Sequence, residues 1–497
     1  MTTKVAKGTL WTLFGVILPI GFSVFTTPIL TRLLGTESYG LLVLILLIPN
    51  YLNFADFGMN IASTKFASAA QAEGAAEKEA RIVRTSALIA LVSSLPFAAG
   101  IAIFSRPILQ LFNVSGSLID EGSLALKLAA VILVVNFLNI ILNTPELTRF
   151  RMDLNTSITA AGRILGLIAA PIVVLLGGGV LGAVAATLAA SLLTLSGHVF
   201  CGIKLLPEMA GFSIDRESVR PLIKFGSSLM VAYVAGALIM HLEKFVLTRV
   251  TSVETLAYYS VAAAFAGMVG IFAGSMAQSL MPAFSQLQGE AMRPALSALY
   301  SRGIRAVMVC LLPIYVLMIL GARIFFTYWF SPEFGQESTV PFYIIVTGFL
   351  FTMLTYFPYT IVIAAGRSDV LAKIYWLELI PYLLLVWWLA DRYGAVGAAA
   401  AWSIRSLLDS ILMFALAHRV GGVSYLQKNV PQFLAAAAIM LLPVAALAYF
   451  RELNLQVIAL TLIAGCLYAM LITTRVLDTA EVAWLKGRMY AYLGRSE

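Results

Sequence analysis

The stretch ILGLIAAPIVVLLGGGVLGAVAATLAASLLTLSGHVFCGI, Ile164–Ile203, carries no Asp, Glu, Lys or Arg over 40 residues. About 20 apolar residues at 1.5 Å each cross the hydrocarbon core of a bilayer. This run is therefore too long for one spanning helix and long enough for two. The three consecutive glycines at 177–179 divide it near its middle. The stretch predicts two membrane-spanning helices joined by a tight turn.

The composition predicts a lipid environment for the whole chain. Its 497 residues are 60% hydrophobic and 12% charged, with a mean hydropathy of +0.92, whereas soluble domains carry about 25% charged residues. The net charge of +8 would suggest a nucleic-acid partner in a soluble protein. We expect none here, because the cations gather on one side of the predicted spans. Cys201, Cys310 and Cys466 form neither a disulfide spacing nor a metal motif, and we expect no cofactor.

The apolar runs predict an all-α polytopic membrane protein of about fourteen transmembrane helices. The predicted spans lie near 8–31, 38–62, 84–105, 122–144, 156–176, 180–204, 221–242, 255–280, 302–322, 338–363, 370–390, 394–418, 430–450 and 454–474. With the N-terminus inside, cytoplasmic segments hold 23 Lys and Arg residues, the opposite side 7 and the spans 3. Cytoplasmic loops carry such an excess. Because the bias persists to the last span, we expect both termini in the cytoplasm.

An internal repeat divides the predicted spans into two like-oriented halves. Leu30-Thr31-Arg32 recurs as Leu247-Thr248-Arg249, and the glycine-rich run 179–183 recurs as 394–398. Five such matches keep one order, at offsets that drift only from 217 to 215 residues. Parallel repeats imply a substrate cavity between lobes. The prediction is two six-helix lobes over 1–206 and 207–422, two further helices over 423–476, and a cytoplasmic tail over 477–497.

Two motifs resemble those of a known family. The run RLLGTESYG, Arg32–Gly40, resembles the signature of the polysaccharide transport family, and Ala55-Asp56-Phe57-Gly58 resembles a second piece of it. That family, which includes O-antigen, capsule and exopolysaccharide flippases, belongs to the multidrug/oligosaccharidyl-lipid/polysaccharide exporter superfamily. The resemblance implies alternating access between two lobes, moving an undecaprenyl-linked oligosaccharide from the inner to the outer leaflet of a bacterial inner membrane. Its implied partners are that lipid-linked oligosaccharide, the bilayer, and as further candidates a polysaccharide polymerase and chain-length machinery.

Ionisable residues within the spans are the candidate site residues, because each costs ~2.5–3.5 kcal/mol to insert into a bilayer. The candidates for binding a lipid-linked phosphate are Arg163, Lys127 and Arg405. Arginine suits this role because its guanidinium donates bidentate hydrogen bonds to phosphate. The candidates for coupling or gating are Asp56, Glu378 and Asp409.

Each phosphate-binding candidate also has a structural interpretation. Arg163 either faces the transport cavity or pairs with neighbouring side chains and holds the lobes together. Lys127 either faces the cavity or extends to the membrane interface. A stripe of asparagines, Asn136, Asn139 and Asn143, either makes interhelix hydrogen bonds or contacts sugar.

The coupling and gating candidates are ambiguous in the same way. Glu378, Arg405 and Asp409 form either a purely structural network or a switch between inward- and outward-facing states; Arg405 and Asp409 are four residues apart on one predicted helix. Asp56 either binds a coupling cation or proton, or anchors Lys65 or a helix end.

Two other functions compete with a flippase. A membrane glycan polymerase or ligase is disfavoured because the predicted outer loops are short and offer no acid–base arrangement beyond the adjacent Asp120-Glu121. We expect no enzymatic activity and no catalytic residue. An ion-coupled multidrug or small-cation exporter remains the main alternative, against which the cations within the spans argue. Direct drive by ATP is disfavoured because the chain has no G-x-x-x-x-G-K-[ST] phosphate cradle.

Overall fold

The computed structural model describes residues 2–477, with gaps at 53–55, 57, 212, 271–272, 275, 278–279, 281–283, 285–286, 288, 366, 424–429 and 451. The predicted tail beyond 477 lies outside the described residues. Nearly all of the described chain is helical, and no strand occurs in it. The predicted all-α class is confirmed.

The helices follow the predicted spans closely. The first part of the chain contains α1 (Thr2–Leu34), α2 (Thr36–Tyr51), α3 (Met59–Ala72), α4 (Ala76–Ile103), α5 (Ser105–Leu111), α6 (Gly116–Leu142), α7 (Thr144–Thr148), α8 (Met152–Val173), η2 (Val174–Gly178), α9 (Gly179–Leu205), η3 (Pro207–Ala210), α10 (Arg216–Val250) and α11 (Val253–Gly267). The remainder contains η4 (Glu290–Met292), α13 (Arg293–Phe325), η5 (Phe326–Phe330), α14 (Pro332–Glu337), α15 (Thr339–Ala364), α16 (Ser368–Gly421), α17 (Val430–Phe450), α18 (Leu455–Leu471) and η6 (Ile472–Val476).

Length and hydropathy give these helices membrane-spanning character. Among the described residues, nine helical runs are long and apolar enough to cross a bilayer, and two of them reach 54 and 49 residues. Their large apolar side chains are extensively exposed, as at Leu176 and Leu455, both 81% exposed. Exposed apolar side chains in such numbers fit a lipid surround, because large apolar patches are rare on soluble monomers.

Glycines divide both of the longest runs where the sequence predicted two spans. Gly177 takes φ +91° within the π-helical turn η2, and Gly179 takes φ +56°. Inside α16, Gly394 takes φ +55°. Only glycine adopts such angles readily. Gly179 and Gly394 are equivalent positions of the internal repeat and have nearly the same φ, which supports the repeat.

The second predicted span is interrupted, so the prediction of a continuous helix over 38–62 is wrong. Helix α2 ends at Tyr51, two residues after Pro49, and α3 begins only at Met59. Gly58, just before α3, takes φ +68°, and a Cβ there would lie 2.7 Å from the carbonyl oxygen of Gly226 in α10. The close backbone approach at Gly58 leaves no room for a side chain.

The signature run Arg32–Gly40 forms a turn and a close helix contact. Gly35 makes the turn between α1 and α2 with φ +78°. A Cβ at Gly40 would lie 1.8 Å from the carbonyl oxygen of Val253 at the start of α11, and the hydroxyl of Ser115 donates a hydrogen bond to Glu37. Gly35, Glu37 and Gly40 of the signature therefore each have a structural role.

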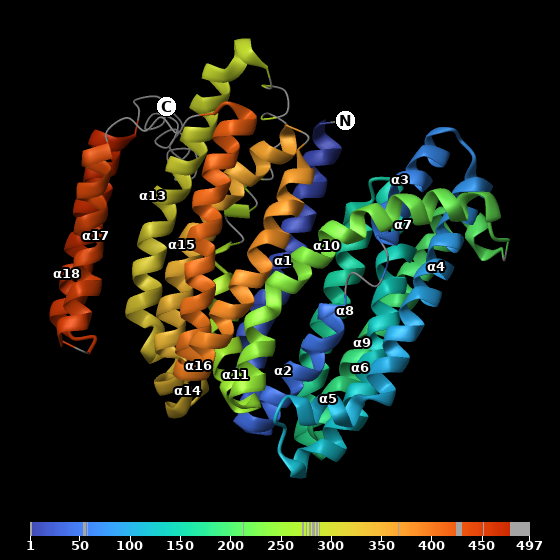
Figure 1. Ribbon diagram of the computed structural model, residues 1–497, viewed down its shortest axis with the longest axis horizontal. Helices are drawn as coiled ribbons and strands as arrows, with labels where there is room; N and C mark the ends of the chain where they lie inside the picture. Colours follow the sequence, from blue (N-terminus) through green and yellow to red (C-terminus); the bar gives the residue numbers. More distant parts are fainter. Residues whose placement is uncertain are drawn as a thin grey trace, which may run out of the picture. The chain divides into compact units, whose positions relative to one another are not determined.

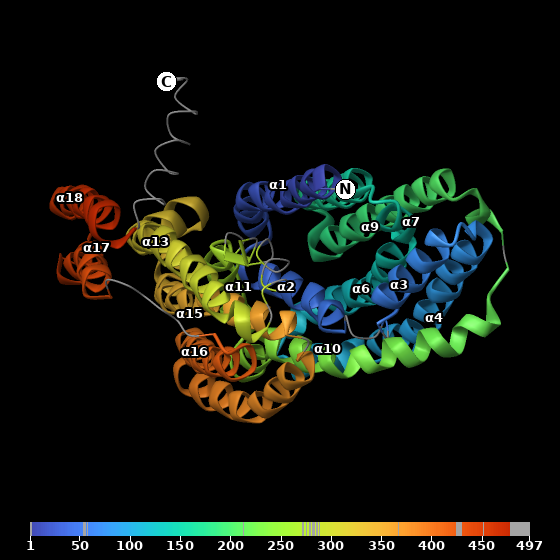
Figure 2. The same ribbon diagram turned by 90° about the horizontal axis from the view of Figure 1, so that it is seen from above.

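The chain divides into two compact units, Met1–Ser260 with Ala372–Ala401, and Val261–Leu371 with Trp402–Glu497. In the first unit, α8 packs against α1 and α9, and α6 lies beside α9 (Figures 1 and 2). Small residues allow these contacts: a Cβ at Gly162 would lie 1.8 Å from the Thr194 hydroxyl oxygen, and one at Gly166 3.4 Å from Ala190. Gly-x-x-x-Gly spacing is typical of closely packed membrane helices.

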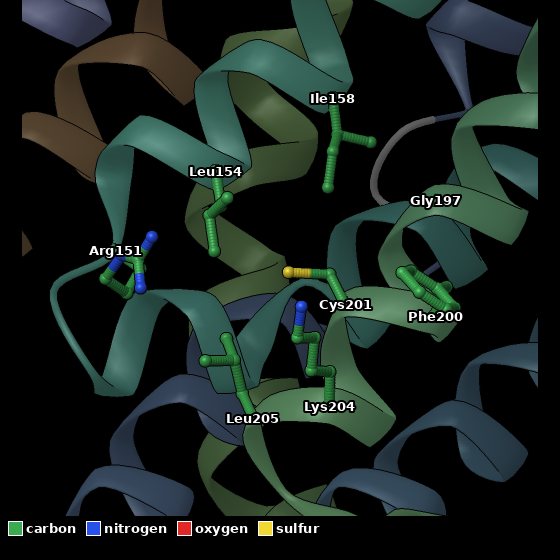
Figure 3. Close-up of a pocket in the computed structure, with 8 residues that line it drawn as sticks. All are labelled: Arg151, Leu154, Ile158, Gly197, Phe200, Cys201, Lys204 and Leu205. Atoms are coloured by element: carbon green, nitrogen blue, oxygen red, sulfur yellow. The ribbon is translucent and has the colours of Figure 1, made fainter.

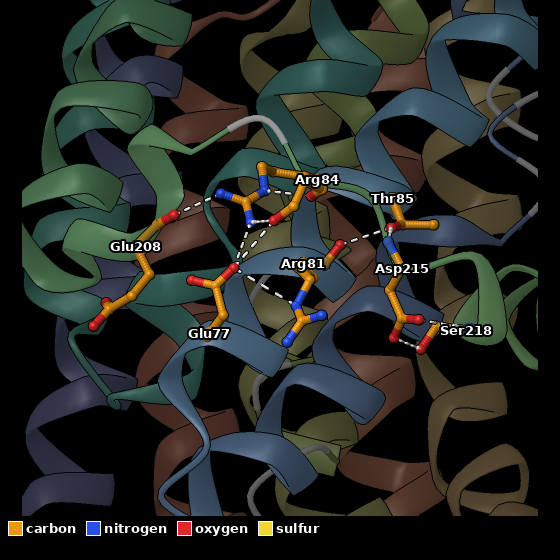
Figure 4. A network of polar contacts seen from close by, with 8 residues as sticks. Glu77, Arg81, Arg84, Thr85, Glu208, Asp215 and Ser218 are labelled. Carbon is orange, nitrogen blue, oxygen red and sulfur yellow. Dashed lines mark hydrogen bonds and ion pairs between the residues drawn. The ribbon is translucent and has the colours of Figure 1, made fainter.

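A polar network at the surface of this unit holds the segment between α9 and α10 (Figure 4). Arg84 of α4 donates to the carbonyl oxygens of Glu208 and Ser213, at 2.5 and 3.0 Å, and contacts Glu77 at 3.3 Å. Asp215 caps α10 by accepting from the backbone N–H groups of residues 217 and 218, at 3.0 and 3.3 Å. These contacts anchor the connection between the predicted lobes.

In the second unit, α17 packs against both α13 and α18. Their shared core contains Val316, Phe433, Met440, Val457 and Tyr468, all less than 7% exposed, and the Tyr468 hydroxyl donates to the Val309 carbonyl oxygen at 2.9 Å. Helices α17 and α18 are the two that lie outside the repeat. The lobe boundaries at 206 and 422 remain a prediction from the repeat.

Candidate functional site

Arg163 lies near the middle of α8 and its side chain is exposed. The apolar residues Leu165, Ile168 and Ile172, each 38–52% exposed, form a stripe on one face of the helix. At 100° per residue, Arg163 lies on the face opposite this stripe. The neighbouring positions Gly162 and Gly166 face α9. Arg163 therefore lies on the side of α8 opposite the exposed apolar stripe.

An exposed guanidinium at this depth requires water. A charged side chain within a span normally faces protein or a water-filled cavity, because lipid does not solvate it. Within the described residues, Arg163 has neither a hydrogen-bond nor an ion-pair partner. A cavity-facing role of Arg163 stays a prediction.

Lys127 lies on a different kind of surface. It is exposed on α6, on the same stripe as Leu124 and Val131, which are 51% and 46% exposed. Apolar neighbours of this kind suit contact with lipid tails, along which a lysine extends toward the interface. Whether Lys127 serves the cavity or the interface stays a prediction.

Asp56 anchors the start of α3. It is 8% exposed, and its two carboxylate oxygens accept hydrogen bonds from the backbone N–H groups of Gly58 and Asn60, at 2.9 and 3.4 Å. Such bonds satisfy N–H groups that a helix start leaves without partners. This contact favours the helix-end interpretation of Asp56. Lys65, its other predicted partner, instead lies over the ring of Phe225 at 3.9 Å.

The residues predicted on spans 11 and 12 share the long helix α16. Glu378 is half-buried and belongs to the first compact unit; Arg405 is half-buried and Asp409 9% exposed, and both belong to the second. Gly394 separates the two stretches. A network or switch that joins the three stays a prediction.

The asparagine stripe makes interhelix contacts. The Asn139 side chain donates to the carbonyl oxygen of Ser191 in α9 at 3.2 Å, and Asn143 donates to Asn155 of α8 at 3.5 Å. Such hydrogen bonds between helices are the usual role of polar side chains in membrane proteins.

Two buried carboxylates beside α7, those of Glu79 and Glu146, each have a close basic partner that the sequence did not predict. Glu79 of α4 is 1% exposed and accepts two hydrogen bonds from the Arg149 guanidinium, at 2.7 and 3.1 Å. Glu146 of α7 is fully buried, with its Oε1 2.9 Å from Nδ1 of His198, which is itself 1% exposed. The predicted spans left Glu79, Glu146 and Arg149 in loops.

One sequence signal pointed toward the second of these pairs. His198 is the one titratable imidazole within the charge-free run 164–203, and a buried polar ring requires a partner. The other nitrogen of His198 lies 3.4 Å from the Thr159 hydroxyl, and Cys201 lies beside Glu146. Within the described residues, no group of three or more His, Cys, Asp or Glu side chains is arranged to hold a metal ion.

The fold is that of polytopic transporters. An inward-closed structure of the lipid II flippase MurJ matches with a TM-score of 0.68 at 13% identity, covering 99% of this chain and 100% of that one. An inward-facing multidrug resistance MATE family transporter of the MOP superfamily matches with a TM-score of 0.65 at 12% identity, covering 82% and 95%. At such low identity these similarities establish the fold alone.

Sequence relatives identify the family. A protein of Shigella flexneri named "Putative O-antigen transporter" is 25% identical over 423 residues, which cover 82% of this chain and 97% of that protein. An uncharacterised membrane protein of Methanocaldococcus jannaschii is 23% identical over 199 residues, 39% of each chain. The family described as polysaccharide biosynthesis protein matches residues 5–288. The chain belongs to this family, which confirms the resemblance predicted from Arg32–Gly40.

Proposed function

We propose that this chain is a flippase that moves a polyprenyl-phosphate- or diphosphate-linked oligosaccharide from the inner to the outer leaflet for surface polysaccharide biosynthesis. The observation that carries this proposal is the similarity to the Shigella protein named "Putative O-antigen transporter" over nearly all of that protein's length. The full-length match to the fold of a lipid II flippase supports it. The protein acts in a bacterial inner membrane, with both termini in the cytoplasm.

Arg163 contacts the phosphate of the lipid carrier during transport. The phosphate must leave its hydration shell, and charge-assisted hydrogen bonds from a guanidinium replace that water. The exposed position of Arg163 in the middle of α8, opposite the apolar stripe, supports this role. The two lobes alternate between inward- and outward-facing states, so that the phosphate and the glycan cross together.

A multidrug exporter is the second candidate, because MATE transporters share the fold. Two observations favour the flippase. The match to the MATE fold covers 82% of this chain, whereas the match to the flippase fold covers 99%. In addition, an exposed arginine within a span suits an anionic substrate better than a cationic drug.

The test compares Arg163→Ala and Arg163→Lys with Leu165→Ala, a control on the opposite face of the same helix. Each variant is expressed in a strain that lacks the native gene, its membrane insertion is verified, and the lipid-linked oligosaccharide in each leaflet is quantified. We expect Arg163→Ala to lower transport about tenfold, as the loss of one charge-assisted contact implies, and Arg163→Lys to retain part of it. Leu165→Ala is expected to transport normally.

Normal transport by Arg163→Ala would remove Arg163 from the mechanism. If the wild-type protein instead lowers drug susceptibility and leaves the oligosaccharide in the inner leaflet, the exporter alternative replaces the flippase.

A further inference from the structure

A hollow of about 440 Å³ lies where α8 begins and α9 ends (Figure 3). Its lining combines apolar side chains with two cations: Leu154, Ile158, Gly197, Phe200, Cys201 and Leu205 with Arg151 and Lys204. In Figure 3, Leu154 and Lys204 point into the hollow. A small apolar space with basic groups at its margin suits an amphiphile with an anionic head.

Both cations can donate to such a head group. Lys204 is exposed, and within the described residues it has neither a hydrogen-bond nor an ion-pair partner. Arg151 contacts Asp153 through Nε and Nη2, at 3.0 and 2.9 Å, while Nη1 has no such contact in the described chain. The Arg151 and Asp153 side chains are 46% and 36% exposed, and an exposed pair is weak enough to exchange partners.

The hollow opens toward the lipid-facing surface of α9. Phe200, which lines it, is 72% exposed, and the neighbouring Ile203 is 39% exposed. Because α8 begins and α9 ends here, the hollow lies at the end of two spans, the depth at which lipid head groups reside. An occupant can therefore enter sideways from the bilayer.

We propose that this hollow binds the phosphate head of an anionic glycerophospholipid of the surrounding membrane. Lys204 and the Nη1 group of Arg151 contact the phosphate, and the first part of an acyl chain lies along Leu154, Ile158 and Phe200. The volume suits one head group with a short length of chain, since pockets of roughly 300–1,000 Å³ take single small ligands. The site is separate from Arg163 and does not depend on the proposed transport.

The test uses native mass spectrometry of the full chain in detergent. Phosphatidylglycerol and phosphatidylcholine with identical acyl chains are added at equal concentration, and undecaprenyl phosphate in a parallel series. We expect preferential binding of phosphatidylglycerol. Lys204→Ala lowers that binding about fivefold, the effect of one basic side chain near anionic lipid, and Lys204→Arg preserves it. Leu154→Trp fills the hollow without changing its charge and also lowers binding.

Lys78→Ala is the matched control. Lys78 is an exposed lysine paired with Glu73 outside the hollow, so its loss removes the same charge and leaves phosphatidylglycerol binding unchanged.

Three results would overturn the assignment. Equal binding of phosphatidylcholine and phosphatidylglycerol would mean that the cations do not select the head group. Equal effects of Lys204→Ala and Lys78→Ala would reduce the site to general surface charge. Preference for undecaprenyl phosphate over phosphatidylglycerol would assign the hollow to a polyprenyl carrier.

Discussion

The polar pairs beside α7 and the arginine in the middle of α8 differ in how far their side chains are exposed. Glu79, Glu146 and His198 are at most 1% exposed and have close partners. Arg163 is exposed although it lies within a span. The predicted spans left Glu79 and Glu146 in loops, whereas Arg163, within a span, was expected either to face a cavity or to pair with neighbouring side chains. Hydropathy indicates the depth of a residue along the membrane normal, whereas packing between helices determines its exposure.

The largest effect is expected from breaking a buried pair. Glu79→Ala leaves the Arg149 guanidinium without its bidentate acceptor and lowers the free energy of unfolding by about 3–5 kcal/mol. Thermal unfolding of the purified protein in detergent measures this loss. The control is Glu73→Ala, which breaks the exposed Glu73–Lys78 pair at 58% and 51% exposure and costs at most ~1 kcal/mol. Equal losses would show that burial does not strengthen the first pair.

The second effect tests packing without charge. Gly40→Ala places a Cβ 1.8 Å from the Val253 carbonyl oxygen, whereas a Cβ at Gly100 meets nothing within 4 Å. We expect Gly40→Ala to lower the free energy of unfolding by about 1–3 kcal/mol, the usual effect of overpacking. Gly100→Ala, with φ negative and open space around it, is expected to be neutral or slightly stabilising. A neutral Gly40→Ala would contradict the close contact at the signature motif.

A smaller effect is expected at the exposed cap of α10. The Ser218 hydroxyl, followed by backbone N–H groups, lowers the pKa of Asp215 below its usual value. A lowered folded-state pKa gives stability that is present above the unfolded pKa of ~3.9 and is lost as pH falls through the folded value. Asp215→Ala is expected to cost about 1 kcal/mol at neutral pH.

The control at this cap is Asp215→Asn, which retains a capping oxygen. It is expected to keep most of the stability at neutral pH and to lose the acid dependence that Asp215 contributes. Unfolding midpoints between pH 3 and 7 measure both changes. An unchanged acid dependence in Asp215→Asn would contradict the assignment.

The smallest change in stability is expected for Arg163→Ala. Because this side chain is exposed, we expect the free energy of unfolding to change by no more than ~0.5 kcal/mol. Transport is expected to fall in the same variant. A stability loss comparable to that of Glu79→Ala would instead return Arg163 to the structural interpretation.

The sequence predicted the features that depend on local rules. The charge-free run 164–203 and its glycines predicted the α8–α9 hairpin. The internal repeat predicted the equivalent break at Gly394. The interruption of the second span was missed because its causes lie partly elsewhere in the chain: Gly58 approaches the α10 backbone at Gly226. The Glu146–His198 pair joins positions 52 residues apart. No spacing rule relates them, since their contact arises only when α7 and α9 pack.

The glycine turn between α8 and α9 has a consequence for how the chain enters the membrane. Residues 177–179 make the turn without a single charged side chain, so the turn itself supplies no topological signal to the insertion machinery. We therefore expect the two helices to insert together as one hairpin, with its direction determined by the cations at the far ends, Arg151 and Lys204. In the second half, Gly394 directly follows Asp391-Arg392-Tyr393. The two hairpins thus share a shape and differ in the electrostatic cost of bringing their turns across the bilayer.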